Sequence, residues 1–235
     1  MKWRKPSKHT TVETTWKGIF VTCNRGRELQ CAREVQQWFE TVLEESPEFE
    51  TPEEDAPNDD VEGDIEKEVA ALTSKKRKRV VVHANLGVEC VIFAQVRFPI
   101  DAVQLTLKLC DVAKKGEYTT KYIQRLGPVQ QFIKIDEQMA DIGGLKPVLD
   151  EHMRKDTKFA IRPTLRLTAV TRDRVIPAVA KLVGPGHSVS LSAFEQLVLV
   201  EGFKGVLGIA VLDTPAEKVN EYCRFNIAQI VASDK

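Results

Sequence analysis

The order of strand-like and helix-like segments over residues 16–135 limits the folds that this chain can adopt. Short apolar runs typical of strands alternate with longer segments in which apolar residues recur at the helical period. The segments read strand, helix, strand, strand, helix, strand, at residues 16–23, 27–43, 78–84, 87–96, 99–116 and 120–135. This order predicts the split βαββαβ arrangement of a ferredoxin-like α+β unit.

A second α+β unit is expected in the remainder of the chain. A helical pattern interrupted at Gly143 and Gly144 leads into the alternating strand TKFAIRPTLRLTAV, in which Pro163 indicates a sheet edge or a bulge. A helix from Thr171 to Gly184 follows, then three short strands, HSVSL, EQLVLVEGF and GVLGIAVLD, and a C-terminal helix, AEKVNEYCRFNIAQIVA. We therefore expect an N-terminal tail at 1–15, a ferredoxin-like domain at 16–133 and a second domain at 134–235.

Charge is distributed unevenly along the chain, although its net charge is zero. Residues 44–68 hold thirteen acidic residues and one lysine, a net charge of −12, so the other 210 residues carry +12. Residues 44–63 are also poor in large apolar side chains, which predicts a disordered acidic loop, and a helical pattern resumes at 64–76. A basic body is typical of nucleic-acid-binding proteins, with a surface of ordinary solvated lysines as the alternative.

Motifs of catalytic and cofactor sites are absent from the sequence. The glycine-rich VGPGHSVSL follows a helix and leads into a strand, whereas a phosphate-binding loop follows a strand and opens a helix. The five cysteines contain no CxxC pair and the four histidines have no metal-ligand spacing. We therefore expect no catalytic residue, no cofactor and no metal. No apolar run is long enough for a membrane span or a signal peptide, so we expect an intracellular protein without a membrane partner.

Two cationic groups are candidate RNA contacts. The first lies in KYIQR, combines charge with a ring that can stack on a base, and comprises Lys121, Tyr122 and Arg125. The second surrounds one predicted strand-to-helix junction and comprises Arg162, Arg166, Arg172 and Arg174. Backbone amides at the start of that helix would add to the attraction for phosphate. The basic run KKRKR at 75–79 fits a nuclear import signal, a nucleic-acid patch or a solvated surface segment.

Four segments resemble those of THUMP-domain proteins, specifically the THUMP adaptors of tRNA cytidine acetyltransferases (the THUMP domain-containing protein 1 group). They are VTCNRGRE, YIQRLGPV, RDRVIPAVAKLVGPGHSVSL and LVLVEGFKGVLGIAVL. The resemblance covers residues 17–43 and about 80–230, and it implies a ferredoxin-like domain followed by a THUMP domain. It also implies a noncatalytic adaptor that binds tRNA. The adaptor would present serine and leucine tRNAs to a separate RNA cytidine acetyltransferase, which forms N4-acetylcytidine in the D arm.

Lys204 matches the family lysine and is expected beside a phosphate. Gly202, Gly205 and Gly208 stand in or between strand-like runs, where glycine costs stability. They would let the strand backbone approach a nucleotide, and a tight hairpin that needs no ligand is the alternative interpretation.

Lys181 and His187, the latter as a hydrogen-bond donor, complete the set of expected RNA contacts. The chain departs from the family at Ser190, where aspartate is frequent, and at Ala210, where serine is. We expect a nuclear and in particular nucleolar protein, with a cytoplasmic fraction and no small-molecule substrate. Two other functions stay open: an RNA-modifying enzyme that acts alone, and a protein-only scaffold whose acidic loop recruits a basic partner.

Overall fold

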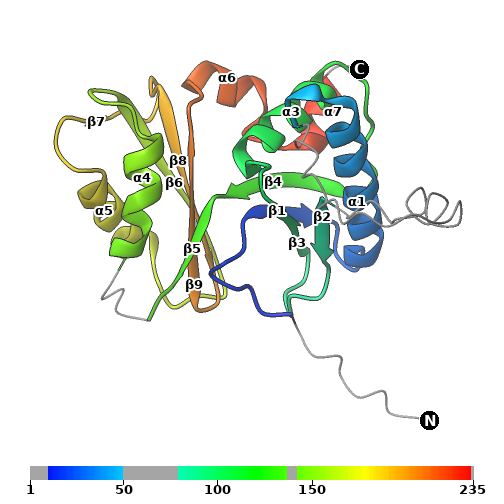
Figure 1. Ribbon diagram of the computed structural model, residues 1–235, viewed down its shortest axis with the longest axis horizontal. Helices are drawn as coiled ribbons and strands as arrows, with labels where there is room; N and C mark the ends of the chain where they lie inside the picture. Colours follow the sequence, from blue (N-terminus) through cyan, green and yellow to red (C-terminus); the bar gives the residue numbers. More distant parts are fainter. Residues whose placement is uncertain (1–9, 50–78, 137–141, 234–235) are drawn as a thin grey trace, which may run out of the picture.

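Two β-sheets stand side by side in the computed structural model of this chain, with helices on their outer sides (Figure 1). The structure describes residues 10–49, 79–136 and 142–233. The predicted helix at 64–76 and most of the basic run at 75–79 lie outside these residues. No helix in the described part of the chain is both long enough and apolar enough to cross a bilayer.

The first sheet has the strand order β2-β3-β1-β4, and its neighbouring strands are antiparallel. Its elements are β1 (Gly18–Cys23), α1 (Glu28–Glu45), β2 (Val80–His83), β3 (Val91–Val96), α3 (Ala102–Lys114) and β4 (Ile123–Val129). Asp101 caps α3 as its sequence predicts, because its Oδ1 accepts hydrogen bonds from the amides of Val103 and Gln104 at 2.9 Å. The predicted ferredoxin-like arrangement is therefore confirmed.

The second sheet has the strand order β5-β9-β8-β6-β7. Its strands are β5 (Gln131–Lys134), β6 (Lys158–Arg166), β7 (Ser188–Val189), β8 (Gln196–Phe203) and β9 (Val206–Leu212). A 3-10 turn, η2 (Gly143–Leu145), precedes α4 (Lys146–His152), and α4 and α5 (Arg172–Val183) cover one face of the sheet. Among the described residues β7 pairs with β6 only at Lys158 and Phe159, so the rest of that edge is open. Pro163 lies on this open edge, as its sequence position predicts.

The chain passes from one sheet to the other at Gln130, in a segment that the sequence predicts as one strand. The Gln130 amide donates to the Ile209 carbonyl, and its buried side chain accepts from the amide of Val211 and donates to Asp101 Oδ2. All four residues of β5 pair with β9. The predicted boundary between residues 133 and 134 therefore falls inside a strand of the second sheet.

The predicted single C-terminal helix is wrong, because it is two helices, α6 (Ala216–Glu221) and α7 (Ile227–Ser233). Cys223, Arg224 and Phe225 between them have φ angles of 47°, 57° and 64°, which a right-handed helix cannot contain. After this turn, α7 packs against β4 and α3 (Figure 1). The end of the described chain thus returns to the first sheet.

The predicted disordered loop at 44–63 is wrong over its first six residues. Helix α1 continues to Glu45, and a 3-10 turn, η1 (Pro47–Phe49), follows it. Phe49 is a large apolar side chain in this acidic stretch, and it is buried in the core under the first sheet. Lys108 also pairs with Glu48 at 2.7 Å. Residues 50–63 lie outside the described residues.

The two halves of the molecule share their core. We call β1–β4 with α1, α3 and α7 the first unit, and β5–β9 with α4 and α5 the second unit. Leu197, Leu199 and Leu212 of the second unit belong to the same buried cluster as the helices of the first unit. On the other face of the first sheet, Phe20 contacts Phe203 at a ring distance of 5.4 Å. Side chains from the two units can therefore form one site.

Candidate nucleic-acid interface

Arginines from both units lie together where β4 approaches the second sheet. We call them the arginine cluster: Arg125 on β4, Arg162 and Arg166 on β6, and Arg224 in the turn between α6 and α7. Burial lowers the pKa of Arg162, and the positive charges of Arg224 and Arg125 lower it further. The structure thus brings together three of the residues that the sequence predicts and adds Arg224, which the sequence analysis missed.

The alternation of β6 explains why two of these arginines face the first unit. Side chains along a strand point to opposite faces of the sheet in turn. Phe159 and Ile161 pack under α4 and α5, whereas Ala160 packs in the core shared with the first unit. Arg162 and Arg166 follow Ala160 by two and six residues, so their side chains point to the same face of the sheet as that of Ala160. They therefore lie on the side of the second sheet that faces β4.

Glu201 on β8 is the acidic residue of this region, and it is 6% exposed. Its Oε2 accepts a hydrogen bond from Nη1 of Arg166 at 2.8 Å. Burial raises the pKa of Glu201, and Arg166 opposes this most strongly, followed by Thr164 and Arg125. Glu201 is thus near Arg166 and Arg125, and Arg162 is near Arg125 and Arg224, so the arginine cluster carries more positive than negative charge.

Gly127 allows β4 to come this close to Glu201. A Cβ atom at residue 127 would stand 2.7 Å from Oε1 of Glu201. Only a residue without a side chain fits there without moving the carboxylate. The glycine therefore holds Arg125, two residues earlier on β4, near the arginines of β6.

Nη1 of Arg162 is buried and has no hydrogen-bond partner among the described residues. Buried polar groups in folded proteins nearly always have a partner, since an unpaired one loses its hydration without compensation. The arginine cluster therefore contains a donor that is not used within the described fold.

The predicted residues of α5 do not join the arginine cluster. Arg172, Arg174 and Lys181 are exposed, and they lie on the helix that covers the opposite face of the second sheet. The strand-to-helix junction that the sequence treats as one basic group is therefore divided between two sides of the sheet.

Lys121 and Tyr122 precede β4 and interact with one another. The Lys121 ammonium lies 5.5 Å from the centre of the half-buried Tyr122 ring. Their backbone amides donate to the two carboxylate oxygens of Glu34 at 2.7 and 2.8 Å. This loop is thus fixed to α1 by its backbone, while the Lys121 side chain is exposed.

Lys204 occupies the tight turn between β8 and β9 and binds the first unit. Its Nζ donates to the Leu86 carbonyl at 2.6 Å, and it lines a pocket of about 360 Å³ beside Thr168 and Gly205. Its backbone has a φ angle of 53°. The turn therefore joins the two units.

The glycines around Lys204 have a packing role. The space beside Gly208 is filled by Phe132 and Val129, and that beside Gly202 by Leu165. The expectation that Gly202 and Gly208 let a nucleotide approach is therefore wrong, because the chain's own side chains occupy those positions.

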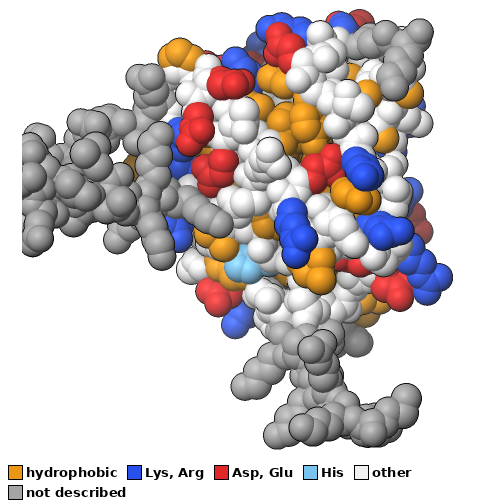
Figure 2. Space-filling model, turned by 90° about the vertical axis from the view of Figure 1, so that its right-hand side faces the viewer, with side chains coloured by type: hydrophobic (Ala, Val, Ile, Leu, Met, Phe, Trp, Pro, Cys, Tyr) orange, Lys and Arg blue, Asp and Glu red, His pale blue; other side chains and the backbone are white. Residues whose placement is uncertain are grey.

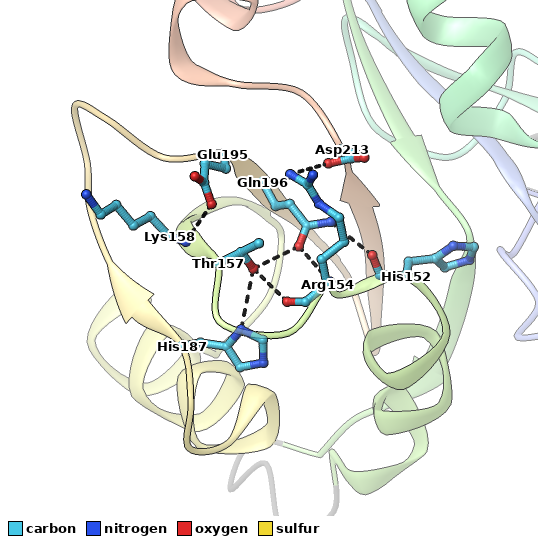
Figure 3. Close-up of polar contacts among 8 residues, drawn as sticks. All are labelled: His152, Arg154, Thr157, Lys158, His187, Glu195, Gln196 and Asp213. Carbon is cyan, nitrogen blue, oxygen red and sulfur yellow. Dashed lines mark hydrogen bonds and ion pairs between the residues drawn. The ribbon is translucent and has the colours of Figure 1, made fainter.

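His187 lies at the opposite end of β6 from Arg166, next to a polar network centred on the buried Gln196 (Figure 3). The Gln196 amide accepts from the backbone of Arg154 at 2.9 Å and donates to the carbonyl of His152 at 3.0 Å. Thr157 lies within hydrogen-bond distance of both Gln196 and Nδ1 of His187, at 3.1 and 3.5 Å. This network fixes the loop after α4, and His187 stands apart from the arginine cluster.

One face of the first unit carries charges of both signs. Figure 2 shows the side of the molecule on which α1 lies, with acidic, basic and apolar side chains mixed over it. A surface with mixed charges has no extended region of positive potential that would attract a polyanion such as RNA.

The comparisons with known proteins agree with the sequence motifs. No family model matches the chain. An uncharacterized protein of Schizosaccharomyces pombe is 29% identical over 231 residues, 95% of this chain and 78% of that protein. The tRNA acetyltransferase TAN1 of Saccharomyces cerevisiae is 29% identical over 249 residues, 92% of this chain and 85% of TAN1. The similarity to TAN1 confirms the family resemblance that the motifs indicate.

Two solved structures also align with 85% of the chain. They are PH1313 from Pyrococcus horikoshii Ot3, with 12% identity and a TM-score of 0.39, and a 4-thiouridine synthetase in complex with RNA and ATP, with 10% identity and a TM-score of 0.40. The chain spans 55% and 42% of these two proteins.

Proposed function

We propose that this chain, which is similar to the yeast tRNA acetyltransferase TAN1 along nearly its whole length, is a noncatalytic tRNA-binding adaptor of an RNA cytidine acetyltransferase. The observation that supports RNA binding most strongly is the arginine cluster, which gathers guanidinium groups from two units and includes a buried Nη1 of Arg162 with no partner among the described residues. RNA is recognised largely through its phosphates and its shape, and guanidinium groups suit phosphate oxygens.

The finer part of the proposal rests on the family resemblance. Residues 134–235 would be the THUMP domain, and the modified base would be N4-acetylcytidine in the D arm of serine and leucine tRNAs. The similarity to a tRNA acetyltransferase, TAN1, supports the link to tRNA acetylation in general. A nuclear location is part of the same proposal.

The remaining candidate residues would contact RNA outside the arginine cluster. Lys121 and Tyr122 stand at the start of β4, so they would extend the contact beyond Arg125 along the first unit. Arg172, Arg174 and Lys181 lie on the other side of the second sheet, so they would contact a different part of a folded tRNA. His187 and Lys204 would contribute at the two ends of β6 and β8.

A tRNA titration without the acetyltransferase tests the RNA-binding part of this proposal. The purified chain should bind tRNA at low salt, and the logarithm of its affinity should fall linearly as the logarithm of the salt concentration rises, because phosphate contacts release counterions. Absence of binding at low salt, or an affinity that salt does not change, would overturn the proposal.

A further inference from the structure

The turn between α6 and α7 has an unfavourable backbone that the fold nevertheless maintains. Cys223, Arg224 and Phe225 all have positive φ angles, and none of them is a glycine. Side chains with a Cβ atom avoid this region, and several such residues in succession are rare. Strained backbone of this kind persists only where its surroundings hold it, and it is frequent at functional sites.

Contacts on both sides hold the turn in place. Tyr222 and Phe225 are buried in the core of the first unit. The Phe225 carbonyl accepts a hydrogen bond from the Leu126 amide of β4 at 3.0 Å, and Asn226 forms a β-bridge with Arg125. The turn is therefore attached to the strand that carries Arg125. This attachment places the exposed Arg224 next to the other arginines.

The position of Arg224 is also electrostatically unfavourable within the chain alone. It stands near Arg162 and Arg125. Burial lowers the pKa of Arg162, and the positive charges of Arg224 and Arg125 lower it further. Like charges repel more strongly where water is partly excluded. The carboxylate of Glu201, which lies in this region, is already paired with Arg166. Strain and repulsion therefore act together at the same place.

An anion between these arginines would offset their mutual repulsion and would give the unused donor a hydrogen-bond partner. Nη1 of Arg162 is buried without a partner among the described residues, so it has a hydrogen bond to give. Guanidinium groups donate strong hydrogen bonds to phosphate oxygens. Each of the two charged oxygens of a phosphodiester can accept more than one such bond, so three guanidinium groups can each donate to one phosphate. Arg125 and Arg224 are exposed, so these two members of the site are accessible from solvent.

We propose that Arg125, Arg162 and Arg224 bind one phosphate group, and that this phosphate is a backbone phosphodiester of RNA. The inference rests on the proposed function and deepens it, because it assigns one phosphate contact to three named side chains. Arg166 is not part of this site, since it holds Glu201.

Replacing Arg224 by glycine separates a binding role from a backbone role. Arg224→Gly removes the cation and also the Cβ penalty at φ 57°, so the variant should be at least as stable as the wild-type chain in urea. Its tRNA affinity should fall by about 10- to 100-fold, as expected for a lost charged hydrogen bond. The slope of log affinity against log salt should decrease by at most about 0.7 to 0.9, the full share of one phosphate, because Arg125 and Arg162 remain.

Two further variants serve as controls. Arg224→Lys keeps the charge but loses the planar fork, so its affinity should lie between those of the wild type and Arg224→Gly. Arg33→Gln removes one positive charge from an exposed position on α1, from a residue that is not a member of the arginine cluster. An equal loss of affinity in Arg33→Gln would show a general charge effect and overturn the proposed site.

The outcomes also distinguish this inference from the proposed function. If wild-type protein binds tRNA in a salt-dependent manner and Arg224→Gly binds equally well, the phosphate site is wrong and the function stands. If wild-type protein does not bind tRNA, the proposed function itself fails. A third outcome is that millimolar inorganic phosphate stabilises the wild type but not Arg162→Gln, while Arg162→Gln binds tRNA as tightly as the wild type. That outcome would assign the site to free phosphate and overturn the RNA ligand.

Discussion

Nη1 of Arg166 donates to Oε2 of the buried Glu201 at 2.8 Å, across the neighbouring strands β6 and β8. This pair lies on the side of the second sheet that faces β4, where Oε1 of Glu201 is close to Gly127. Burial favours the neutral form of the carboxyl group, so the folded protein keeps Glu201 ionised only at a cost that Arg166 offsets.

Removing the arginine of this pair should destabilise the fold. Arg166→Met leaves a buried carboxylate without its main partner, and we expect the free energy of unfolding to fall by about 3 kcal/mol. Arg166→Met combined with Glu201→Gln should recover part of that loss, because no charge then remains buried. Urea unfolding of both single variants and the double variant measures the coupling. Strictly additive effects would contradict the pairing.

The stability contribution of Glu201 should depend on pH. Its folded pKa is raised above the ordinary value of 4.5, so its contribution is fully present below pH 4.5 and is lost as the pH rises through the folded pKa. The free energy of unfolding of the wild type, minus that of Glu201→Gln, should therefore decrease as the pH rises from 4. Urea titrations between pH 4 and 8 give this difference. An increase over that range would mean that the sign of the pKa shift is wrong.

The glycines of the β8–β9 hairpin provide a matched pair of variants. Gly208→Ala places a Cβ atom 2.6 Å from the Phe132 ring and 2.7 Å from Val129, so it should cost about 1 to 3 kcal/mol of stability. In Gly205→Ala the nearest heavy atom is the Ile135 carbonyl oxygen at 4.0 Å, so its stability should be close to that of the wild type. Thermal or urea unfolding compares the two. Equal stability of both variants would show that Phe132 does not fill this space.

Gln130 should act as the connection between the two sheets. It is 5% exposed, accepts from the Val211 amide at 2.9 Å and donates to Asp101 at 3.0 Å. Gln130→Leu leaves the Val211 amide buried and unpaired, and we expect a loss of about 1 to 3 kcal/mol. Gln131→Leu is the control, because the half-buried Gln131 side chain makes one hydrogen bond among the described residues, to the Gly144 carbonyl. A larger loss in the control would contradict the role of Gln130.

Local sequence signals predict most of the elements because each signal acts within a few residues. Asp101 caps α3 through its own neighbours, and Gly184 ends α5 with a φ angle of 86°. The change of sheet at Gln130 carries no such local signal. An apolar run has the same sequence pattern whether it pairs within one sheet or within two. Which sheet each part of the run joins depends on its partner strands, which lie far away in the sequence.

The candidate site could be predicted only in part, for the same physical reason. The sequence places Arg162 and Arg172 in one basic group, but strand alternation and the position of α5 put them on opposite sides of the second sheet. The sequence does not point to Arg224, because residues 216–233 contain no glycine or proline that would indicate a break between two helices. Its left-handed turn is imposed by the burial of Tyr222 and Phe225 and by the attachment to β4.

The adaptor role is tested most directly by an acetylation assay with tRNA and acetyl-CoA, in which the chain and the RNA cytidine acetyltransferase are added separately and together. We expect no acetylcytidine from the chain alone and the highest yield with both proteins present, reduced when Arg162→Gln replaces the wild-type chain. Acetylcytidine formed by the chain without the acetyltransferase, or a yield that the chain does not change, would contradict a noncatalytic adaptor.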